Sequence, residues 1–214
     1  MPFLKSIEVE CGAKIYLWGV TEDSEALQIL CDESGVEYTE EELDMPEHRL
    51  AEILATRLLL NHIFGADIRL LHHENGAPYI VGEDYISISH TKGCIAIAVY
   101  EYDMVGVDIE VVNSRVLRIK DKFLNDSEKL FIATDDIQRT LMAWCAKEAL
   151  FKAIPENGID FRENLLLEPF DIVTVDAPIS FNANFLKGDS DDKYQLWSYK
   201  YENYIIIFTT LSNG

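Results

Sequence analysis

The chain has 214 residues, which is enough for one large domain or for two small domains with a hydrophobic core. Its formal net charge of −20 argues against non-specific binding to nucleic acid or to anionic membranes, because those polyanions bind clustered Lys and Arg. No apolar run reaches the roughly 18 residues of a membrane-spanning helix, and residues 1–8 lack the basic-then-apolar pattern of a secretory signal. These features predict a cytoplasmic protein.

The first part of the chain predicts one strand and two helices. Residues 14–20 alternate like a strand, and residues 22–31 follow as a short helix that begins at Thr21. The apolar spacing in residues 46–64 predicts a long amphipathic helix that ends at Gly65. No Lys or Arg occurs from position 15 through position 48, where many acids are found, so we expect a solvated acidic surface there.

Several short strands are expected next, at residues 67–73, 79–81, 85–90 and 94–102. Asn75-Gly76 forms a turn between the first two of them. In the strand at 85–90, Ile86 and Ile88 share one face, while Ser87 and Ser89 share the other. Short turns between antiparallel neighbours would bring residues 89–90 and 108–110 into one sheet.

Two acids share one face of the next predicted strand. Val105, Val107, Ile109 and Val111 alternate with Gly106, Asp108 and Glu110, which is typical of a strand with one face on a core. Neighbouring carboxylates repel each other, and burying them unpaired would cost several kcal/mol. The pattern therefore predicts a positive charge over this face.

A later helix is expected to bring further charged groups to the same place. It begins near Thr134-Asp135-Asp136 and is stopped by Pro155, and it places Glu148 and Lys152 on one face because they are four residues apart. Carboxylate oxygens suit a hard ion such as Mg2+, which usually completes its shell with water and substrate phosphate. Together these residues indicate a phosphate-handling site.

The remainder of the second half predicts a capping box and three strands. The box, Asn125-Asp126-Ser127-Glu128, opens a short helix. The strands are expected at residues 171–175, 193–201 and 204–210, and the last two form a hairpin about Glu202-Asn203.

A basic segment follows the paired acids. Its cations are Arg115, Arg118, Lys120 and Lys122. Apolar residues lie among them, so the segment could dock an acidic helical partner. The alternative is a helix that packs on the core with its cations in solvent.

The sequence resembles a known family at two spaced motifs. Gly106-Val107-Asp108-Ile109-Glu110 and, some forty residues later, Trp144-Cys145-Ala146-Lys147-Glu148-Ala149-Leu150-Phe151-Lys152 resemble the paired signature of the 4'-phosphopantetheinyl transferases. The likeness is to the larger, pseudo-dimeric, surfactin-synthetase-activating type. Ser87-Ile88-Ser89-His90 and Asn75-Gly76-Ala77-Pro78 resemble two weaker upstream motifs of the family, in the same order.

This resemblance implies transfer of the 4'-phosphopantetheine arm of coenzyme A to a serine hydroxyl of an apo acyl or peptidyl carrier protein, with release of adenosine 3',5'-bisphosphate. Mg2+ is the expected cofactor, with Asp108, Glu110 and Glu148 as its ligands. Glu148 and Lys152 are the expected catalytic residues, the first as base for the serine and the second beside the leaving bisphosphate. The expected contacts to coenzyme A are Arg49, Ser89, His90, Lys147 and Lys152. The carrier protein is expected to dock near Arg115, Arg118, Lys120 and Lys122.

The predicted fold class is α+β, with two similar halves in a pseudo-twofold arrangement. The expected halves are residues 1–103 and 104–214, each a mainly antiparallel sheet packed on a long helix, with the site at the seam. A duplicated chain of this kind could work as a monomer.

The chain also departs from the family pattern. Ala77 stands where many members carry Lys, and the early helical region, cationic in many members, is acidic in this chain. Two further hypotheses therefore stay open. One is a Mg2+-dependent phosphohydrolase acting on a nucleotide-like substrate, and the other is a non-catalytic homologue that binds carrier proteins.

Overall fold

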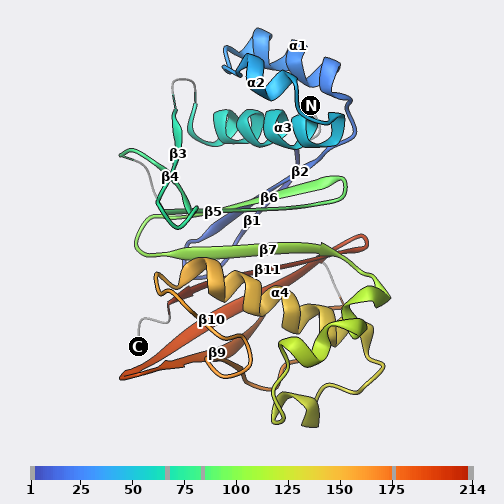
Figure 1. The fold of residues 1–214 in the computed structure, drawn as a ribbon, viewed down its shortest axis with the longest axis vertical. Coiled ribbons are helices and arrows are strands. Elements are labelled where there is room, and N and C mark those ends of the chain that lie inside the picture. The colour runs from blue at the N-terminus through green and yellow to red at the C-terminus, as the bar shows by residue number, and fades with distance from the viewer. Residues whose placement is uncertain (1–2, 66–67, 83–84, 175–176, 212–214) are drawn as a thin grey trace.

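Two antiparallel sheets pack face to face in the computed structural model, which describes residues 3–65, 68–82, 85–174 and 177–211 (Figure 1). In spatial order, the first sheet contains β1 (Phe3–Glu8), β2 (Lys14–Gly19), β6 (Cys94–Tyr100) and β5 (Tyr85–Thr91). The second contains β7 (Val105–Val111), β11 (Tyr204–Leu211), β10 (Ser190–Tyr201), β9 (Ile179–Lys187) and β8 (Leu165–Leu167). The mixed α+β class is confirmed.

Helices cover the outer faces of both sheets. The first sheet carries α1 (Ser24–Ser34), α2 (Glu40–Leu43) and α3 (Glu47–Phe64), and the second carries α4 (Ile137–Ala153) (Figure 1). A small hairpin of β3 (Leu70–His72) and β4 (Pro78–Ile80) joins α3 to β5. Three 3-10 helices, η1 (Ser114–Arg118), η2 (Lys120–Lys122) and η3 (Glu128–Leu130), join β7 to α4. None of the helices in the described segments is long and apolar enough to cross a membrane.

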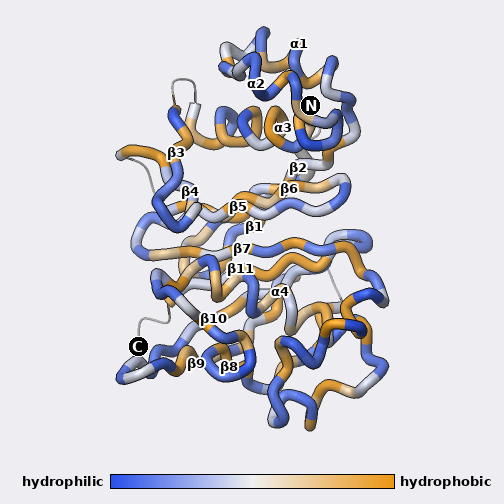
Figure 2. The backbone as a smooth tube through the Cα atoms, viewed as in Figure 1, coloured by the Kyte–Doolittle hydropathy of each residue, from blue (hydrophilic) through white to orange (hydrophobic). Residues whose placement is uncertain are grey.

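The alternation of apolar side chains along the strands builds three hydrophobic layers (Figure 2). In β6, Ile95 and Ile97 face α3, whereas Ala96 and Ala98 face the second sheet. β7 contributes Val107 and its alternating neighbours to the layer between the sheets, so its acidic face is turned toward α4. Because β5 and β7 are edge strands of their own sheets, the two sheets meet where these strands lie side by side.

Most long elements match the sequence predictions, which include β2, α3, β5, β6, β7, α4 and the β10–β11 hairpin. The capping box is also confirmed, because Asn125 Oδ1 accepts from Glu128 N–H and Glu128 Oε2 accepts from Asn125 N–H. It opens a single 3-10 turn, η3.

Several boundaries and short elements were predicted wrongly. The first helix is capped by Asp23 rather than Thr21, because the Asp23 carboxylate accepts from Ala26 N–H. Residues 171–174 form no strand, and Val175 lies outside the described residues; β8 and β9 form that part of the sheet instead. The strand expected at 67–73 is limited to β3, and Asp67 also lies outside the described residues. The prediction omitted β1 and α2.

The acidic N-terminal region is partly neutralised inside the fold. Thr39 and Glu42 form a reciprocal cap at the start of α2. Arg57 of α3 then donates to both carboxylate oxygens of Glu42, at 2.6 and 3.0 Å. Arg57 is therefore occupied in holding α2 against α3.

Candidate active site

Gly106 allows α4 to approach β7 more closely than any other residue would. A Cβ atom at this position would lie 1.9 Å from the Ala149 carbonyl oxygen and 3.0 Å from the Ala153 nitrogen. Those contacts are with helix backbone, which cannot move aside as a flexible side chain could. The glycine therefore brings Glu148 and Lys152 of α4 beside the acidic face of β7.

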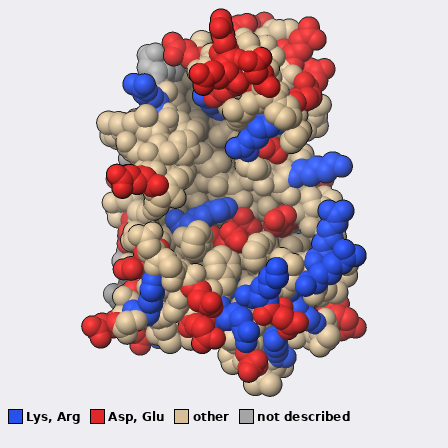
Figure 3. Space-filling view, in the orientation of Figure 1, with Lys and Arg blue, Asp and Glu red and all other residues tan. Residues whose placement is uncertain are grey.

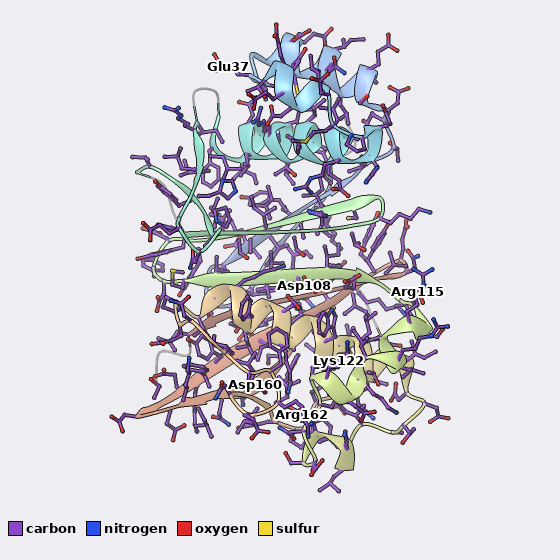
Figure 4. The ribbon with its side chains drawn as sticks, viewed as in Figure 1. Glu37, Asp108, Arg115, Lys122, Asp160 and Arg162 are labelled. Atoms are coloured by element: carbon purple, nitrogen blue, oxygen red, sulfur yellow. The ribbon has the colours of Figure 1, made fainter. Side chains whose placement is uncertain are left out.

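Asp108 lies at the centre of this contact (Figure 4). It is buried, and its Oδ1 accepts from Ser89 Oγ at 2.8 Å and from Lys152 Nζ at 2.9 Å. Its other oxygen, Oδ2, is buried without a hydrogen-bond partner of normal geometry among the described residues, although the Cys145 thiol lies near Asp108, and burial followed by the charge of Asp108 raises the pKa of that thiol. An unpaired buried carboxylate oxygen is costly, so this atom is a natural place for a bound cation.

Lys152 links the helix to the strand through two contacts. Its ammonium group donates to Asp108 Oδ1 and to the Val107 carbonyl oxygen, both at 2.9 Å. The side chain stays about a quarter exposed, so it borders solvent as well as the buried acid. The predicted positive charge over the acidic face is therefore supplied at least in part by Lys152.

The other two acids are electrostatically coupled to Asp108. Burial raises the pKa of the Glu148 carboxyl, and the charges of Asp108 and Glu110 raise it further, while Lys152 lowers it. Burial also raises the pKa of the Glu110 carboxyl, with Asp108 as the next cause. Hydrogen bonds from Thr91 and Trp144 oppose that rise. The single positive charge of Lys152 therefore balances only part of the negative charge of the three carboxylates.

The chemistry of these groups fits Mg2+, although the side chains do not surround a common point in this conformation. The donors are carboxylate oxygens, one of which is the unpartnered Asp108 Oδ2. Among the residues that the structure describes, no three acidic, histidine or cysteine side chains form a group that could hold a metal ion. The assignment of Asp108, Glu110 and Glu148 as ligands therefore stays a prediction.

Hydroxyl side chains of β5 reach across to β7. Ser87, Ser89 and Thr91 alternate along β5 and contact, respectively, the Val107 nitrogen, the Asp108 carboxylate and the Glu110 carboxylate. The two strands lie in different sheets, so the prediction that residues 89–90 and 108–110 share one sheet is wrong. The prediction that Ser89 lies close to the acids is nevertheless confirmed. The spacing of hydroxyls by two along this strand was the available signal for these contacts.

Two of the predicted coenzyme A contacts lie together, one in the first turn of α3 and the other near the end of β5. Arg49 lies 3.3 Å from His90, measured between Nη1 and Nε2, and both side chains are exposed. Glu52 lies between them, 3.2 Å from Arg49 and 3.6 Å from His90. Arg49 and His90 are thus within reach of a ligand, but an acid shares their site.

Lys147 is not available to a ligand in this structure. Its side chain is fully buried, and its ammonium group donates to Glu128 Oε2 and to the carbonyl oxygens of Phe123 and Phe161, each at 2.8 Å. The structure therefore gives no support to a contact between Lys147 and coenzyme A phosphate, and that contact stays a prediction. Neighbouring positions on a helix point about 100° apart, so Lys147 faces the core while Glu148 faces β7.

The predicted docking segment presents cations on the surface near η1 and η2. Arg115, Arg118 and Lys122 are exposed, while Lys120 is half-buried and donates to the Thr134 carbonyl oxygen. The apolar residues between them mostly pack inward against the core of the second half. Figure 3 shows basic side chains gathered over this part of the molecule, and acidic side chains gathered at the opposite end over α1 and α2.

A cavity of about 1380 Å3 lies away from these groups. It is lined by residues of α1, α3 and β3 and of the segment between α1 and α2, which includes Glu37; Figure 4 shows Glu37 far from Asp108. None of the predicted site residues lines it. The candidate site instead lies where β5, β7 and α4 meet, with Asp108 buried and Lys152 about a quarter exposed.

The chain was compared with known families and with curated proteins. Residues 104–209 match the model of the 4'-phosphopantetheinyl transferase superfamily. The matched segment is just under half of the chain and contains Asp108, Glu110, Glu148 and Lys152. A comparison with curated proteins found no match. The paired motifs and the matching model therefore indicate the same superfamily for this segment, and the larger pseudo-dimeric type stays a prediction.

Proposed function

We propose that this protein transfers the 4'-phosphopantetheine arm of coenzyme A to a serine hydroxyl of an apo acyl or peptidyl carrier protein, in a Mg2+-dependent reaction. The observation that carries the proposal is the coupled cluster of Asp108, Glu110 and Glu148, with Lys152, inside the segment that matches the superfamily. Adenosine 3',5'-bisphosphate would be the second product.

Asp108, Glu110 and Glu148 would hold the metal ion. When bound, Mg2+ supplies a Lewis acid for the pyrophosphate oxygens of coenzyme A. Two observations support these ligands. No residue in the described segments hydrogen-bonds to Asp108 Oδ2, and the pKa values of Glu110 and Glu148 are raised by burial and by the neighbouring acids. A cation brought to this cluster would relieve the repulsion.

Glu148 would accept the proton of the carrier serine, either directly or through a water molecule. A carboxylate held beside the metal ion and the incoming hydroxyl group is placed to take that proton. Lys152 would balance the charge that develops on the leaving bisphosphate. Because its ammonium group borders solvent beside Asp108, it can reach a ligand by a change of side-chain torsion.

Arg49 and His90 would contact the phosphate groups of coenzyme A. Their support is exposure and proximity, since they are 3.3 Å apart at the end of β5, where Ser89 reaches Asp108. Glu52 offsets part of their charge, and Ala77 adds none, so we expect the nucleotide 3'-phosphate to be held weakly.

The carrier protein would dock on the exposed cations near η1 and η2. In a chain of net charge −20, Arg115, Arg118, Lys120 and Lys122 form a local basic region, and α4 with Glu148 follows it in the fold. An acidic carrier helix would be attracted to that region and repelled by the acidic end over α1 and α2.

We also infer that residues 1–103 and 104–214 are two related halves in a pseudo-twofold arrangement, and that the chain works as a monomer. In each half a long helix covers the outer face of an antiparallel sheet, with 18 residues in α3 and 17 in α4. The inner faces of the two sheets share one hydrophobic layer, as expected for two copies of a unit that cannot bury both faces alone.

The test is to incubate the purified chain with Mg2+, coenzyme A and an apo carrier protein, and to measure the intact mass of the carrier. Addition of one phosphopantetheine group supports transfer. Release of nucleotide from coenzyme A without a carrier supports the phosphohydrolase, and carrier binding with neither reaction supports the non-catalytic homologue. Either of those outcomes contradicts the proposal.

A further inference from the structure

The cavity of about 1380 Å3 is built by three segments from the first half of the chain. They are the end of α1 with the residues that follow it, the C-terminal half of α3, and the residues that lead into and through β3. Figure 1 shows α1 and α2 packed over α3, with β3 rising beside the end of that helix. The proposed reaction uses none of the residues that line this cavity, so it is a separate site.

The first segment gives the cavity a negatively charged wall. Asp32 and Glu37 line it and are exposed, and the Glu37 carboxylate forms no hydrogen bond or ion pair within the described residues. The cavity also borders the C-terminal end of α1, where carbonyl groups carry partial negative charge and the last turn has no basic residue. Arg57 lines the cavity too, but its guanidinium group is held by the Glu42 carboxylate and the Glu37 carbonyl oxygen. A cationic group of a ligand would therefore be stabilised beside this wall.

The third segment supplies hydrogen-bond donors that the fold does not use. Arg69 and His72 line the cavity, and both side chains are exposed. Neither side chain forms a hydrogen bond or an ion pair with another residue of the described ranges. A guanidinium group can hold a carboxylate through two parallel hydrogen bonds, and an imidazole ring can donate a further one. An anionic group of a ligand would therefore find donors at this wall.

Apolar side chains make up much of the remaining lining. Leu60 of α3 is almost fully buried, and Val36, Ile68 and Leu70 are half-buried at the cavity. Ligand sites are commonly apolar, with a few polar or charged groups that fix the orientation of the ligand. An apolar ligand body would remove these four side chains from water, which favours binding.

We propose that this cavity binds a short apolar peptide, of about three residues, with both termini free. The ammonium end would lie beside Asp32 and Glu37, where the cavity is negatively charged. The carboxylate end would lie beside Arg69 and His72. A single amino acid carries both charges on one carbon atom, whereas an extended tripeptide separates them by roughly 10 Å and can reach groups from different segments. This site does not rest on the proposed transferase activity.

Trileucine with free termini is the probe, titrated into the full wild-type chain and followed by isothermal titration calorimetry. We expect a Kd between about 10 μM and 1 mM. Two capped forms of the probe test the two ends, because N-acetyl-trileucine lacks the ammonium charge and trileucine amide lacks the carboxylate. Each capped form should bind about threefold more weakly, which is the effect of losing one exposed ion pair.

Two variants correspond to the two ends of the probe. Arg69→Gln should weaken trileucine binding about threefold and leave the binding of trileucine amide unchanged, because the amide has no carboxylate to pair. Glu37→Gln should weaken trileucine binding to the same extent and leave the binding of N-acetyl-trileucine unchanged. Both side chains are exposed, so neither variant should unfold the chain. Lys14→Gln and Glu33→Gln are the controls, since they remove the same charges from exposed positions outside the lining, and they should bind trileucine as the wild type does.

Three results would overturn the proposal. The first is no heat of binding at trileucine concentrations above about 1 mM. The second is equal binding of trileucine and of the peptide capped at both ends. The third is an equal effect of Arg69→Gln and Lys14→Gln. The proposed function is decided separately, because a chain that binds trileucine but modifies no carrier protein contradicts only the transferase, and a chain that modifies a carrier without binding trileucine contradicts only this site.

Discussion

Two lysines of α4 form ion pairs with acids from other elements, and the pairs differ in what they leave unpaired. Lys147 and Glu128 are both 0% exposed, and both carboxylate oxygens of Glu128 are hydrogen-bonded, with Asn125 and Leu167 as the further donors. The pair of Lys152 and Asp108 borders solvent, and within the described part of the chain Asp108 Oδ2 has no hydrogen-bond partner. A fully satisfied pair holds segments of the fold together, whereas a pair with a spare oxygen beside two further acids is arranged to bind a cation.

The largest effect is expected from breaking the satisfied pair. Lys147→Met should lower the free energy of unfolding by about 3–5 kcal/mol, because it leaves Glu128 as an uncompensated buried charge. Urea denaturation measures this loss. The double variant Lys147→Met with Glu128→Leu should recover part of it, and a loss below about 1 kcal/mol for the single variant would contradict the structural role given to this pair.

Substitution in the pair of Lys152 and Asp108 should change the transfer rate more than the stability. Asp108→Asn keeps the size of the side chain but removes a ligand charge, so we expect the transfer rate to fall at least about 100-fold, which corresponds to roughly 3 kcal/mol of transition-state stabilisation. The midpoint of urea unfolding should change little, because the substitution also removes repulsion among the acids. A variant with near-wild-type transfer would show that Asp108 is not a ligand.

The pH dependence of the free energy of unfolding should distinguish Glu148, which lies in the acidic cluster, from an exposed acid. Since folding raises the pKa of Glu148, the folded state binds its proton more tightly than the unfolded state. The stability of the metal-free protein should therefore rise as pH falls from 7 toward this raised pKa. In EDTA, Glu148→Gln should have a higher free energy of unfolding than the wild type at pH 7. Its free energy of unfolding should also increase less than that of the wild type as the pH falls.

Glu163→Gln is the control for this measurement, because Glu163 is an exposed acid outside the cluster. It should leave the pH profile close to that of the wild type. If Glu148→Gln behaves in the same way as Glu163→Gln, the coupling of Glu148 to Asp108 and Glu110 is too weak to support a shared metal site.

The smallest effect is expected at the surface. Arg115→Glu combined with Lys122→Glu should raise the KM for the carrier protein roughly 5- to 10-fold at low salt and leave the KM for coenzyme A unchanged. The exposed lysines of β2 and β10, changed as Lys14→Glu with Lys193→Glu, give the same change in net charge outside the basic segment. Equal effects of the two double variants on the carrier KM would remove the argument for docking near η1 and η2.

The sequence predicted the elements that carry the acids, because their patterns are strong. Alternation in β7 places Asp108 and Glu110 on one face, and the four-residue spacing on α4 pairs Glu148 with Lys152. The same periodicity could not decide the role of Lys147, since its burial depends on the carbonyl groups and the carboxylate supplied by segments distant in the chain. The spacing of residues along a helix or strand shows which side chains share a face. Contacts with distant segments decide which of those faces is buried.

Three of the elements that the sequence reasoning missed, β8, α2 and β9, fall into two groups. β8 is a run of three leucines and α2 is a single turn, so neither has enough length to show a period. β9 does alternate, with Phe181, Ala183 and Phe185 facing the core, and it was readable from that pattern. The contacts of Ser89 could not be predicted in detail, because they join edge strands of two different sheets.

The most direct measurement of the central claim is the intact mass of an apo carrier protein after incubation with coenzyme A and either the wild-type chain or Asp108→Asn, across a Mg2+ titration. The account predicts a mass gain of one phosphopantetheine group that requires Mg2+ and the wild-type aspartate. A gain of the same size and rate without Mg2+, or with the variant, would contradict it.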